Sequence, residues 1–188
     1  MICQGLLSLF FTQGVDNVKI IDKIHKKIYN ISMKHITILT IGTTKELYWK
    51  QAENEYIKRL SPYAKIEILE KKEEAFRSAN QRNAIRKKEA ALILPIIKKH
   101  DIIIALDEIG KQYTSQKFAQ LLETQTMHGE HILFIIGGPL GLDESIKKMA
   151  HNTIALSLLT FPHRMVRTIL LEQLYRAETI LRGKQYHY

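Results

Sequence analysis

The amino-acid sequence predicts an α/β fold organised around a largely parallel sheet. Short apolar runs alternate along the chain with longer segments that carry a helical pattern. Two of the runs, DIIIAL at 101–106 and HILFII at 131–136, are almost wholly apolar. Helices cover both faces of a parallel sheet, so continuous apolar runs of this length are typical of its strands. The sequence has no internal repeat that would favour another architecture.

The first half of the regular pattern contains two strand signals and two helix signals. The strands are expected at 35–41 and 65–70, and the helices at about 46–60 and 83–98. The first strand (HITILTI) ends at Gly42. Pro95 lies inside the second helix, so we expect that helix to kink or to end early, because proline lacks a backbone N–H.

The second half continues the alternation. After the strand at 101–106 we expect a helix from 115 to 127, and after the strand at 131–136 a shorter strand at 152–157. Ser115 is the expected N-cap, since its hydroxyl can accept a hydrogen bond from the first turn. A last helix is expected at about 164–181.

Composition limits the class of protein. The chain has 188 residues and a formal net charge of +9, which suits one domain of ordinary size, or one domain with an appendage. The pI of about 9.5 favours a polyanionic partner, either nucleic acid or an anionic membrane surface. Cys3 is the single cysteine, which excludes an internal disulfide and fits a reducing cytosol. No apolar run reaches the roughly 18 residues of a membrane helix.

The regular pattern begins only at Met33. Residues 1–32 form a leader that combines an apolar run at 2–11 with a Lys- and Ile-rich stretch. The run has no basic residue before it and no small-residue cleavage site after it, so secretion is not expected. We therefore expect a domain at 33–188, preceded either by a start-site artefact or by a genuine, disordered or surface-binding extension.

Three loops follow apolar strands, at the end of the sheet where α/β proteins bind ligands. They are LDEIGK at 106–111, IGGPLGL at 136–142 and LSLLTFPH at 156–163. The second loop spells neither a Walker loop nor a Rossmann turn, which disfavours an NTPase or a dinucleotide-dependent oxidoreductase. Its glycines suit a backbone that approaches a flat ligand closely, although a tight turn without a ligand fits as well. The third loop fits a pocket wall or ordinary core packing.

The last helix has an apolar stripe with a basic side opposite it. The stripe consists of Val166, Leu170, Leu174, Ala177 and Leu181, and it predicts a core-facing surface. Nearly opposite lie Arg164, Arg167, Tyr175 and Arg182, with Glu178 among them. Arginine suits phosphate contact and tyrosine suits base stacking, so this side either binds RNA or is a solvated charged face.

A second basic segment spans residues 77–88 and contains no acidic residue. Its five cations are Arg77, Arg82, Arg86, Lys87 and Lys88. They either contact an RNA backbone or form a solvated helix face. None of the eight histidines stands at HExxH or another metal-ligand spacing, so no metal site is predicted. The sequence also lacks GxSxG and any Ser-His-Asp arrangement.

Several segments, in the right order, closely resemble the RlmH family of bacterial SPOUT-class methyltransferases. They are ITILTIG after Met33, LDEIGK (106–111), IGGPLGL (136–142), LSLLTFPHRMVR (156–167), EQLYRAETILRG (172–183) and the terminal Tyr186-His187. Members of this family methylate N3 of a pseudouridine in large-subunit (23S) ribosomal RNA. The resemblance extends over residues 33–188 and leaves out only 1–32.

The resemblance implies a SPOUT-type parallel sheet with a C-terminal trefoil knot, an obligate homodimer, and S-adenosylmethionine held in the knot. The matching cofactor positions are Leu106, Gly137, Leu156, Ser157, Leu158, Leu159, Thr160 and Phe161. The RNA-binding positions are His163, Arg164, Arg167 and Arg182. On this basis the apolar third loop is expected to line an adenine slot.

His187 and Tyr186 are the expected catalytic residues. The pseudouridine N3 must lose its imide proton, and imidazole titrates near neutrality, so His187 is the expected base or proton relay. Tyr186 is expected to stack on or orient the base, with the tail reaching the partner protomer's cofactor. The expected substrate is 23S rRNA in the cytoplasmic ribosome, without metal or membrane. The alternative is a basic ribosome-binding factor that performs no chemistry.

Overall fold

The computed structural model describes residues 33–75, 79–126 and 129–186. The expected leader at 1–32, the expected base His187, and Arg77 of the basic segment lie outside these ranges. The description that follows concerns the unit Lys34–Tyr188.

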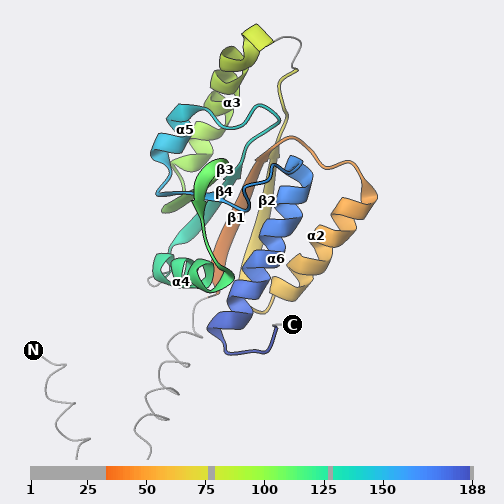
Figure 1. The fold of residues 1–188 in the computed structure, drawn as a ribbon, viewed down its shortest axis with the longest axis vertical. Helices are drawn as coiled ribbons and strands as arrows, with labels where there is room; N and C mark the ends of the chain where they lie inside the picture. The colour runs from red at the N-terminus through yellow and green to blue at the C-terminus, as the bar shows by residue number, and fades with distance from the viewer. Residues whose placement is uncertain (1–32, 76–78, 127–128, 187–188) are drawn as a thin grey trace, which may run out of the picture. The chain divides into compact units, whose positions relative to one another are not determined.

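The fold is built on a five-stranded sheet in the order β2-β1-β4-β3-β5, and every neighbouring pair of strands is parallel (Figure 1). The strands are β1 (Lys34–Ile41), β2 (Ala64–Lys71), β3 (Ile102–Gln112), β4 (His131–Ile136) and β5 (Asn152–Ala155). This confirms the predicted α/β class, with each strand close to its expected position.

Helices form a layer on each face of the sheet. They are α2 (Leu47–Leu60), α3 (Arg82–Ile97), α4 (Ser115–Gln125), α5 (Glu144–Met149) and α6 (His163–Leu181), with a short 3₁₀ turn η1 (Ala79–Gln81) before α3. Residues of α2, α4 and α6 share one apolar cluster with the sheet, and α3 and α5 share the other. Figure 1 shows α2 and α6 side by side. No helix in the described ranges is long and apolar enough to cross a membrane.

The position of β4 in the middle of the sheet explains why its sequence is apolar throughout. Phe134 and its neighbours at alternate positions pack into the cluster beneath α2, α4 and α6. Leu133 and Ile135 face the cluster beneath α3 and α5. Side chains alternate between faces along a strand, so a central strand covered on both faces has no polar side to show.

Strand β3 is longer than the sequence predicted. The expected loop at 106–111 belongs to the strand, which continues to Gln112 through an irregularity. Leu106 and Lys111 both pair with Ile154 of β5, so residues 107–110 bulge out between them. A Cβ on Gly110 would lie 2.5 Å from the carbonyl carbon of Ile154, so glycine is required for this approach.

Three local details differ from what the sequence led us to expect. Helix α3 continues through Pro95 to Ile97, because Pro95 lies on the solvent side, as does Ala91, whose carbonyl loses its helical partner. The N-cap of α4 is Thr114, not Ser115, and its Oγ1 accepts from the N–H of Lys117 (3.2 Å). Helix α5 was not expected, since it has only six residues.

The order of the strands determines where a ligand can bind. Strands β4 and β3 are neighbours, and the connection that follows β3 runs through α4 on one face, whereas the connection that follows β4 runs through α5 on the other. Where successive connections leave the carboxyl edge toward opposite faces, they leave a crevice outside the strand ends.

Candidate functional site

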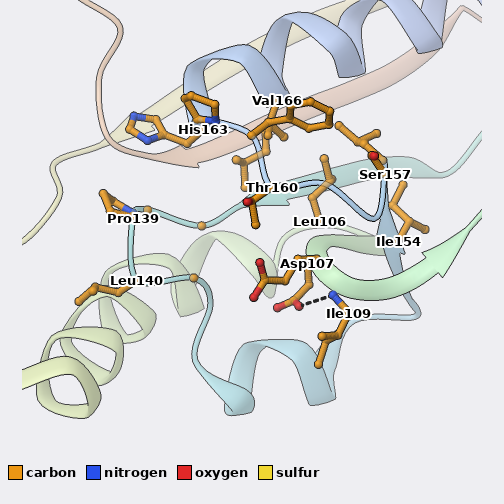
Figure 2. Close-up of a pocket in the computed structure, with 18 of the residues that line it drawn as sticks. Leu106, Asp107, Ile109, Pro139, Leu140, Ile154, Ser157, Thr160, His163 and Val166 are labelled. Carbon is orange, nitrogen blue, oxygen red and sulfur yellow. Dashed lines mark hydrogen bonds between the residues drawn. The ribbon is translucent and has the colours of Figure 1, made fainter. Parts of the chain in front are cut away.

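A cavity of about 640 Å³ lies at the carboxyl ends of β3, β4 and β5 (Figure 2). This volume is within the range of small-molecule sites. Its walls come from the bulge of β3, the loops after β4 and β5, and the beginnings of α3 and α6. The three loops that the sequence singled out thus meet around one space.

Most of the predicted cofactor residues line this cavity. They are Leu106, Gly137, Leu156, Ser157, Leu159, Thr160 and Phe161. Leu158 is the exception: its side chain is 88% exposed and is not part of the wall. The Oγ of Ser157 accepts the N–H of Leu159 (3.0 Å), which makes a tight turn with Leu158 at its tip.

The glycine-rich loop after β4 folds back on itself. A Cβ on Gly137 would lie 2.9 Å from the carbonyl carbon of Gly141, so a side chain there would push the loop open. Gly141 has φ of +75° and donates its N–H to the carbonyl of Gly138 (2.9 Å), which closes the turn. The Nε of Arg86 in α3 donates to the carbonyl of Leu140 (2.6 Å) and so ties the loop to α3.

The bulge of β3 brings an acidic group into the cavity wall. Asp107 accepts the N–H of Ile109 through Oδ1 (3.1 Å) and lies 3.3 Å from the Nζ of Lys147. Lys147 also pairs with Glu144 (2.6 Å). Its hydrogen bond to Glu144 raises the pKa of Lys147 despite its burial. Asp107 is therefore a neutralised structural carboxylate in this arrangement.

His163 begins α6 and lies at the rim of the cavity. Its Nε2 is buried and has no hydrogen-bond partner among the described residues. Burial, and then the charge of Arg164, lower the pKa of His163, so the ring is neutral at pH 7. A Cβ on Gly42 would lie 3.0 Å from Nε2, so the ring packs directly against that glycine.

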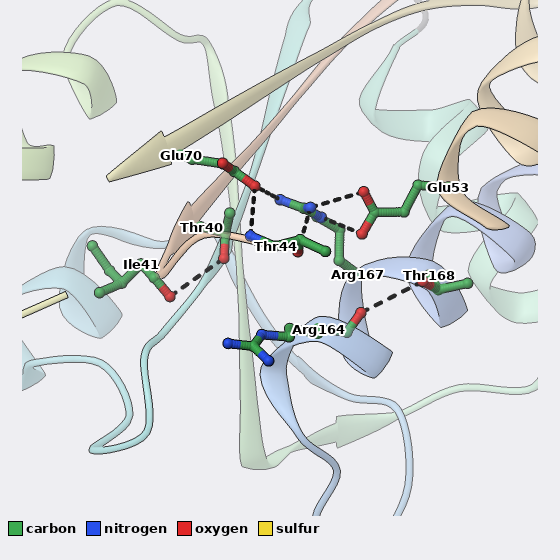
Figure 3. A network of polar contacts seen from close by, with 8 residues as sticks. All are labelled: Thr40, Ile41, Thr44, Glu53, Glu70, Arg164, Arg167 and Thr168. Atoms are coloured by element: carbon green, nitrogen blue, oxygen red, sulfur yellow. Dashed lines mark hydrogen bonds and ion pairs between the residues drawn. The ribbon is translucent and has the colours of Figure 1, made fainter. Parts of the chain in front are cut away.

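Arg167 corrects the expectation of an exposed arginine face on the last helix (Figure 3). Its side chain is only 3% exposed. Its Nε and Nη2 donate to the two oxygens of Glu53 (2.7 and 2.8 Å), and Nη1 donates to Glu70 (2.7 Å). Nη2 also donates to Oγ1 of Thr44 (2.6 Å). With four of its five N–H donors committed to these partners and its side chain almost wholly buried, Arg167 is poorly placed to bind a phosphate.

The other arginines on this side of α6 also pair with carboxylates. Arg164 pairs with Glu46, which precedes α2, and Arg182 pairs with the buried Glu178. The guanidinium of Arg182 also lies over the ring of Tyr63, 4.4 Å from its centre. This side of the helix faces α2 rather than open solvent, whereas the apolar stripe packs into the core as predicted.

Tyr186 lies far from the cavity of its own chain. It follows the C-terminal end of α6, whose 19 residues span about 28 Å. The ring of Tyr186 packs edge-on against Tyr175 at 4.9 Å, and Arg176 lies 4.8 Å from its centre. Lys34, at the start of β1, pairs with Glu178 near the same end of α6 (2.7 Å). The tail therefore begins at the amino edge of the sheet, opposite the cavity.

Arg82 and Arg86 line the cavity, although the sequence placed them only in a basic segment without a location. In the sequence, the only sign of their role was the run of basic residues at 77–88. The connection between this run and the site comes from the packing of α3 against the glycine-rich loop. Within the described ranges, no group of three or more His, Cys, Asp or Glu residues could hold a metal ion.

Replacing Glu89 with glutamine is expected to stabilise the protein at pH 8 but not near pH 4. Glu89 is buried in α3, and burial raises its pKa, although it accepts the N–H of Glu74 (3.1 Å). Above pH 4.5 the unfolded chain releases this proton before the folded one does, so wild-type stability falls as pH rises. Glutamine has no such proton. Thermal melts from pH 4 to 8 test this, with exposed Glu67→Gln as the control; parallel curves for wild type and Glu89→Gln would contradict it.

Comparison with known proteins places these observations in a family. A family model described as "Predicted SPOUT methyltransferase" matches residues 33–187. The Ribosomal RNA large subunit methyltransferase H of Caldicellulosiruptor saccharolyticus is 44% identical over 152 residues, which are 81% of this chain and 99% of the relative. The protein of the same name from Ruminiclostridium cellulolyticum is 44% identical over 156 residues, covering 81% of this chain and 98% of the relative. A solved structure of a probable methyltransferase from Bordetella pertussis Tohama I is 9% identical, with a TM-score of 0.47, and the match covers 82% of this chain and 98% of that one.

Proposed function

The chain belongs to the ribosomal RNA large subunit methyltransferase H family of SPOUT methyltransferases, and from this we propose that it methylates N3 of a pseudouridine in 23S rRNA, using S-adenosylmethionine, on the ribosome in the cytoplasm. The observation that carries the proposal is the single cavity in which the three matching loops meet. The family model matches residues 33–187, which include all three of these loops.

The cavity fits a ligand that has both a flat apolar part and charged groups. Leu106, Leu156 and Phe161 offer apolar walls, and the loop at 156–161 offers backbone groups that can read the edge of an adenine. In the closed turn, Gly137, Gly138 and Gly141 have no side chain to obstruct close contact with their backbone. Bound there, the cofactor would supply a methyl group on a positively charged sulfur.

The protein's own task in this reaction is mainly alignment. The attacking nitrogen must first lose its proton, and we propose His187 as the acceptor, with Tyr186 orienting the base. The neutral ring of His163 at the rim would contact the RNA, and Arg164 and Arg182 would make outer phosphate contacts in addition to their ion pairs. We assign Arg167 no role in RNA binding, because it is buried and four of its five donors bond inside the protein.

We propose that two protomers complete each site. Tyr186 lies at the opposite end of α6 from the cavity, so the tail can act only on a cavity of another chain. Beside the cavity, Leu158, Leu159 and Ile109 are 88%, 71% and 78% exposed, an apolar surface suited to a partner. The C-terminal trefoil knot is part of the same proposal, and the match to the SPOUT family supports it.

Replacing Leu158 with aspartate is expected to convert the dimer to a monomer, because a charge would be buried in the proposed interface. The side chain makes little contact within its own chain, so the fold should be retained. Sedimentation at micromolar concentration measures the change. Leu92→Asp, on the outer side of α3, is the control and should leave the assembly unchanged. A Leu158→Asp protein that sediments like the wild type would contradict the proposed interface.

The function is tested by mapping pseudouridine methylation in ribosomes from a strain that lacks the gene, before and after treatment with the purified protein and S-adenosylmethionine. The proposal expects one N3-methylated pseudouridine to be restored in 23S rRNA. His187→Ala and Tyr186→Ala proteins are expected to bind S-adenosylmethionine in calorimetry but to methylate at a small fraction of the normal rate. A folded wild-type dimer that binds ribosomes but not the cofactor would favour the non-catalytic ribosome-binding factor instead.

A further inference from the structure

We propose that Arg82 and Arg86 of α3 form a phosphate-binding subsite for the RNA substrate at the edge of the cavity. This inference rests on the proposed function, which supplies the RNA. It places the phosphate contact nearest to the reaction on α3, rather than on the last helix, where the sequence led us to expect it.

The first argument is that these two arginines have uncompensated charges. The described ranges contain seven arginines. Five of them pair with carboxylates: Arg59, Arg164, Arg167, Arg176 and Arg182. No ion pair involves Arg82 or Arg86 within the same ranges, and both line the cavity. Among the described arginines, the charge that is free to attract an anion therefore lies at the site.

The second argument is that Arg86 is already oriented. Its Nε donates to the carbonyl of Leu140 (2.6 Å), which fixes the plane of the guanidinium beside the glycine-rich loop. Its two Nη groups have no hydrogen-bond partner among the described residues and remain as a pair of donors. A guanidinium held in this way loses little conformational freedom when it binds the two oxygens of a phosphate.

The surroundings favour a phosphate of a large ligand over the carboxylate of the cofactor. Arg82 is exposed at the rim, in the first turn of α3, where the helix dipole also favours an anion. Lys87 and Lys88, also exposed, extend the basic surface along the helix. Asp143 lies near Arg86, but it caps α5 by accepting the N–H of Ser145 (2.9 Å).

The test compares two double variants that each remove two positive charges, one pair at the beginning of α3 and the other just after its end. Arg82→Ala/Arg86→Ala changes the cavity end, and Lys98→Ala/Lys99→Ala changes the exposed opposite end. Binding to unmethylated large ribosomal subunits is measured without cofactor at several KCl concentrations, and S-adenosylmethionine binding is measured by calorimetry. Arg82→Ala is included alone, because it leaves the bond between Arg86 and Leu140 intact. Thermal melts establish that each variant is folded.

The arginine pair is expected to weaken subunit binding about tenfold or more, and to reduce the slope of log affinity against log salt by about 1 to 2. Arg82→Ala alone should weaken subunit binding several-fold, and the lysine pair should stay within twofold. Cofactor affinity should change less than twofold in Arg82→Ala. Equal losses for both pairs, or a loss confined to cofactor binding, would overturn the inference. A wild-type protein that neither binds nor methylates subunits would instead refute the proposed function.

Discussion

Replacing Arg167 with alanine is expected to lower the free energy of unfolding by about 3–5 kcal/mol, the usual cost of removing one partner from a buried ion pair. The change leaves Glu53 buried and without its two charged hydrogen bonds, and it removes a donor from Glu70 and Thr44. Urea denaturation at pH 7 measures the loss.

The effect of Arg167→Ala should depend on pH. Burial alone would raise the pKa of Glu70, but hydrogen bonds from Arg167 and from the N–H of Thr44 hold it below its usual value. The stability that this lowered pKa contributes is present above the usual value and is lost as pH falls through the folded value. The difference between wild type and variant should therefore shrink in acid.

Arg164→Ala is the matched control for this prediction. It removes the same type of side chain from the preceding turn of α6. However, the side chains of Arg164 and Glu46 are each about one-third exposed in their ion pair. A pair of this kind contributes at most about 1 kcal/mol. Equal losses in the two variants would contradict the view that the Arg167 network, rather than charge on α6 in general, holds this helix to α2.

Replacing Gly110 with alanine is expected to cost about 1–3 kcal/mol or more and to impair cofactor binding. The new Cβ would lie 2.5 Å from the carbonyl carbon of Ile154 and 2.8 Å from the nitrogen of Ala155, and neither backbone atom can move without shifting β5. The loop that follows β5 is a wall of the cavity, so the strain should reach the site. Thermal melts and calorimetry with S-adenosylmethionine measure the two effects.

Gly129→Ala is the control that separates a loss of stability from a loss of cofactor binding. Gly129 has φ of +84° and nothing within 4 Å of a Cβ built on it, so alanine there costs the strain of a left-handed backbone, about 1–2 kcal/mol. It is not part of the cavity wall, and cofactor affinity should be unchanged. If Gly110→Ala bound the cofactor as tightly as Gly129→Ala does, the proposed link between the bulge and the site would fail.

Much of the fold could be predicted because its signals are local. The six residues HILFII are apolar at nearly every position, which by itself predicts that both faces of β4 are buried. The glycines of the loop after β4 likewise indicate that the backbone of this loop approaches itself closely. The bulge of β3 could not be predicted, because Leu106 and Lys111 pair with a single residue more than 40 positions away, and nothing local shows this.

The basic residues of the site were harder to interpret for a related reason. Helical periodicity correctly separated the stripe around Leu170 from the side carrying Arg167. It gave no information on whether another helix covers that second side. The carboxylates that neutralise Arg167 lie 97 and 114 positions earlier, on β2 and α2. The orientation of the Arg86 side chain likewise depends on its hydrogen bond to the carbonyl of Leu140, 54 positions later.

The contacts of α6 have a consequence for the order of events during biosynthesis. They join residues very far apart in the chain: Lys34 with Glu178 at a separation of 144, and Arg164 with Glu46 at 118. Contacts with such long loops form slowly, and none can form before the ribosome has synthesised the last helix. The loop at 156–161 immediately precedes that helix, so a nascent chain has most of its sheet before it has a complete binding pocket. The binding pocket is therefore completed only after the last helix has been synthesised.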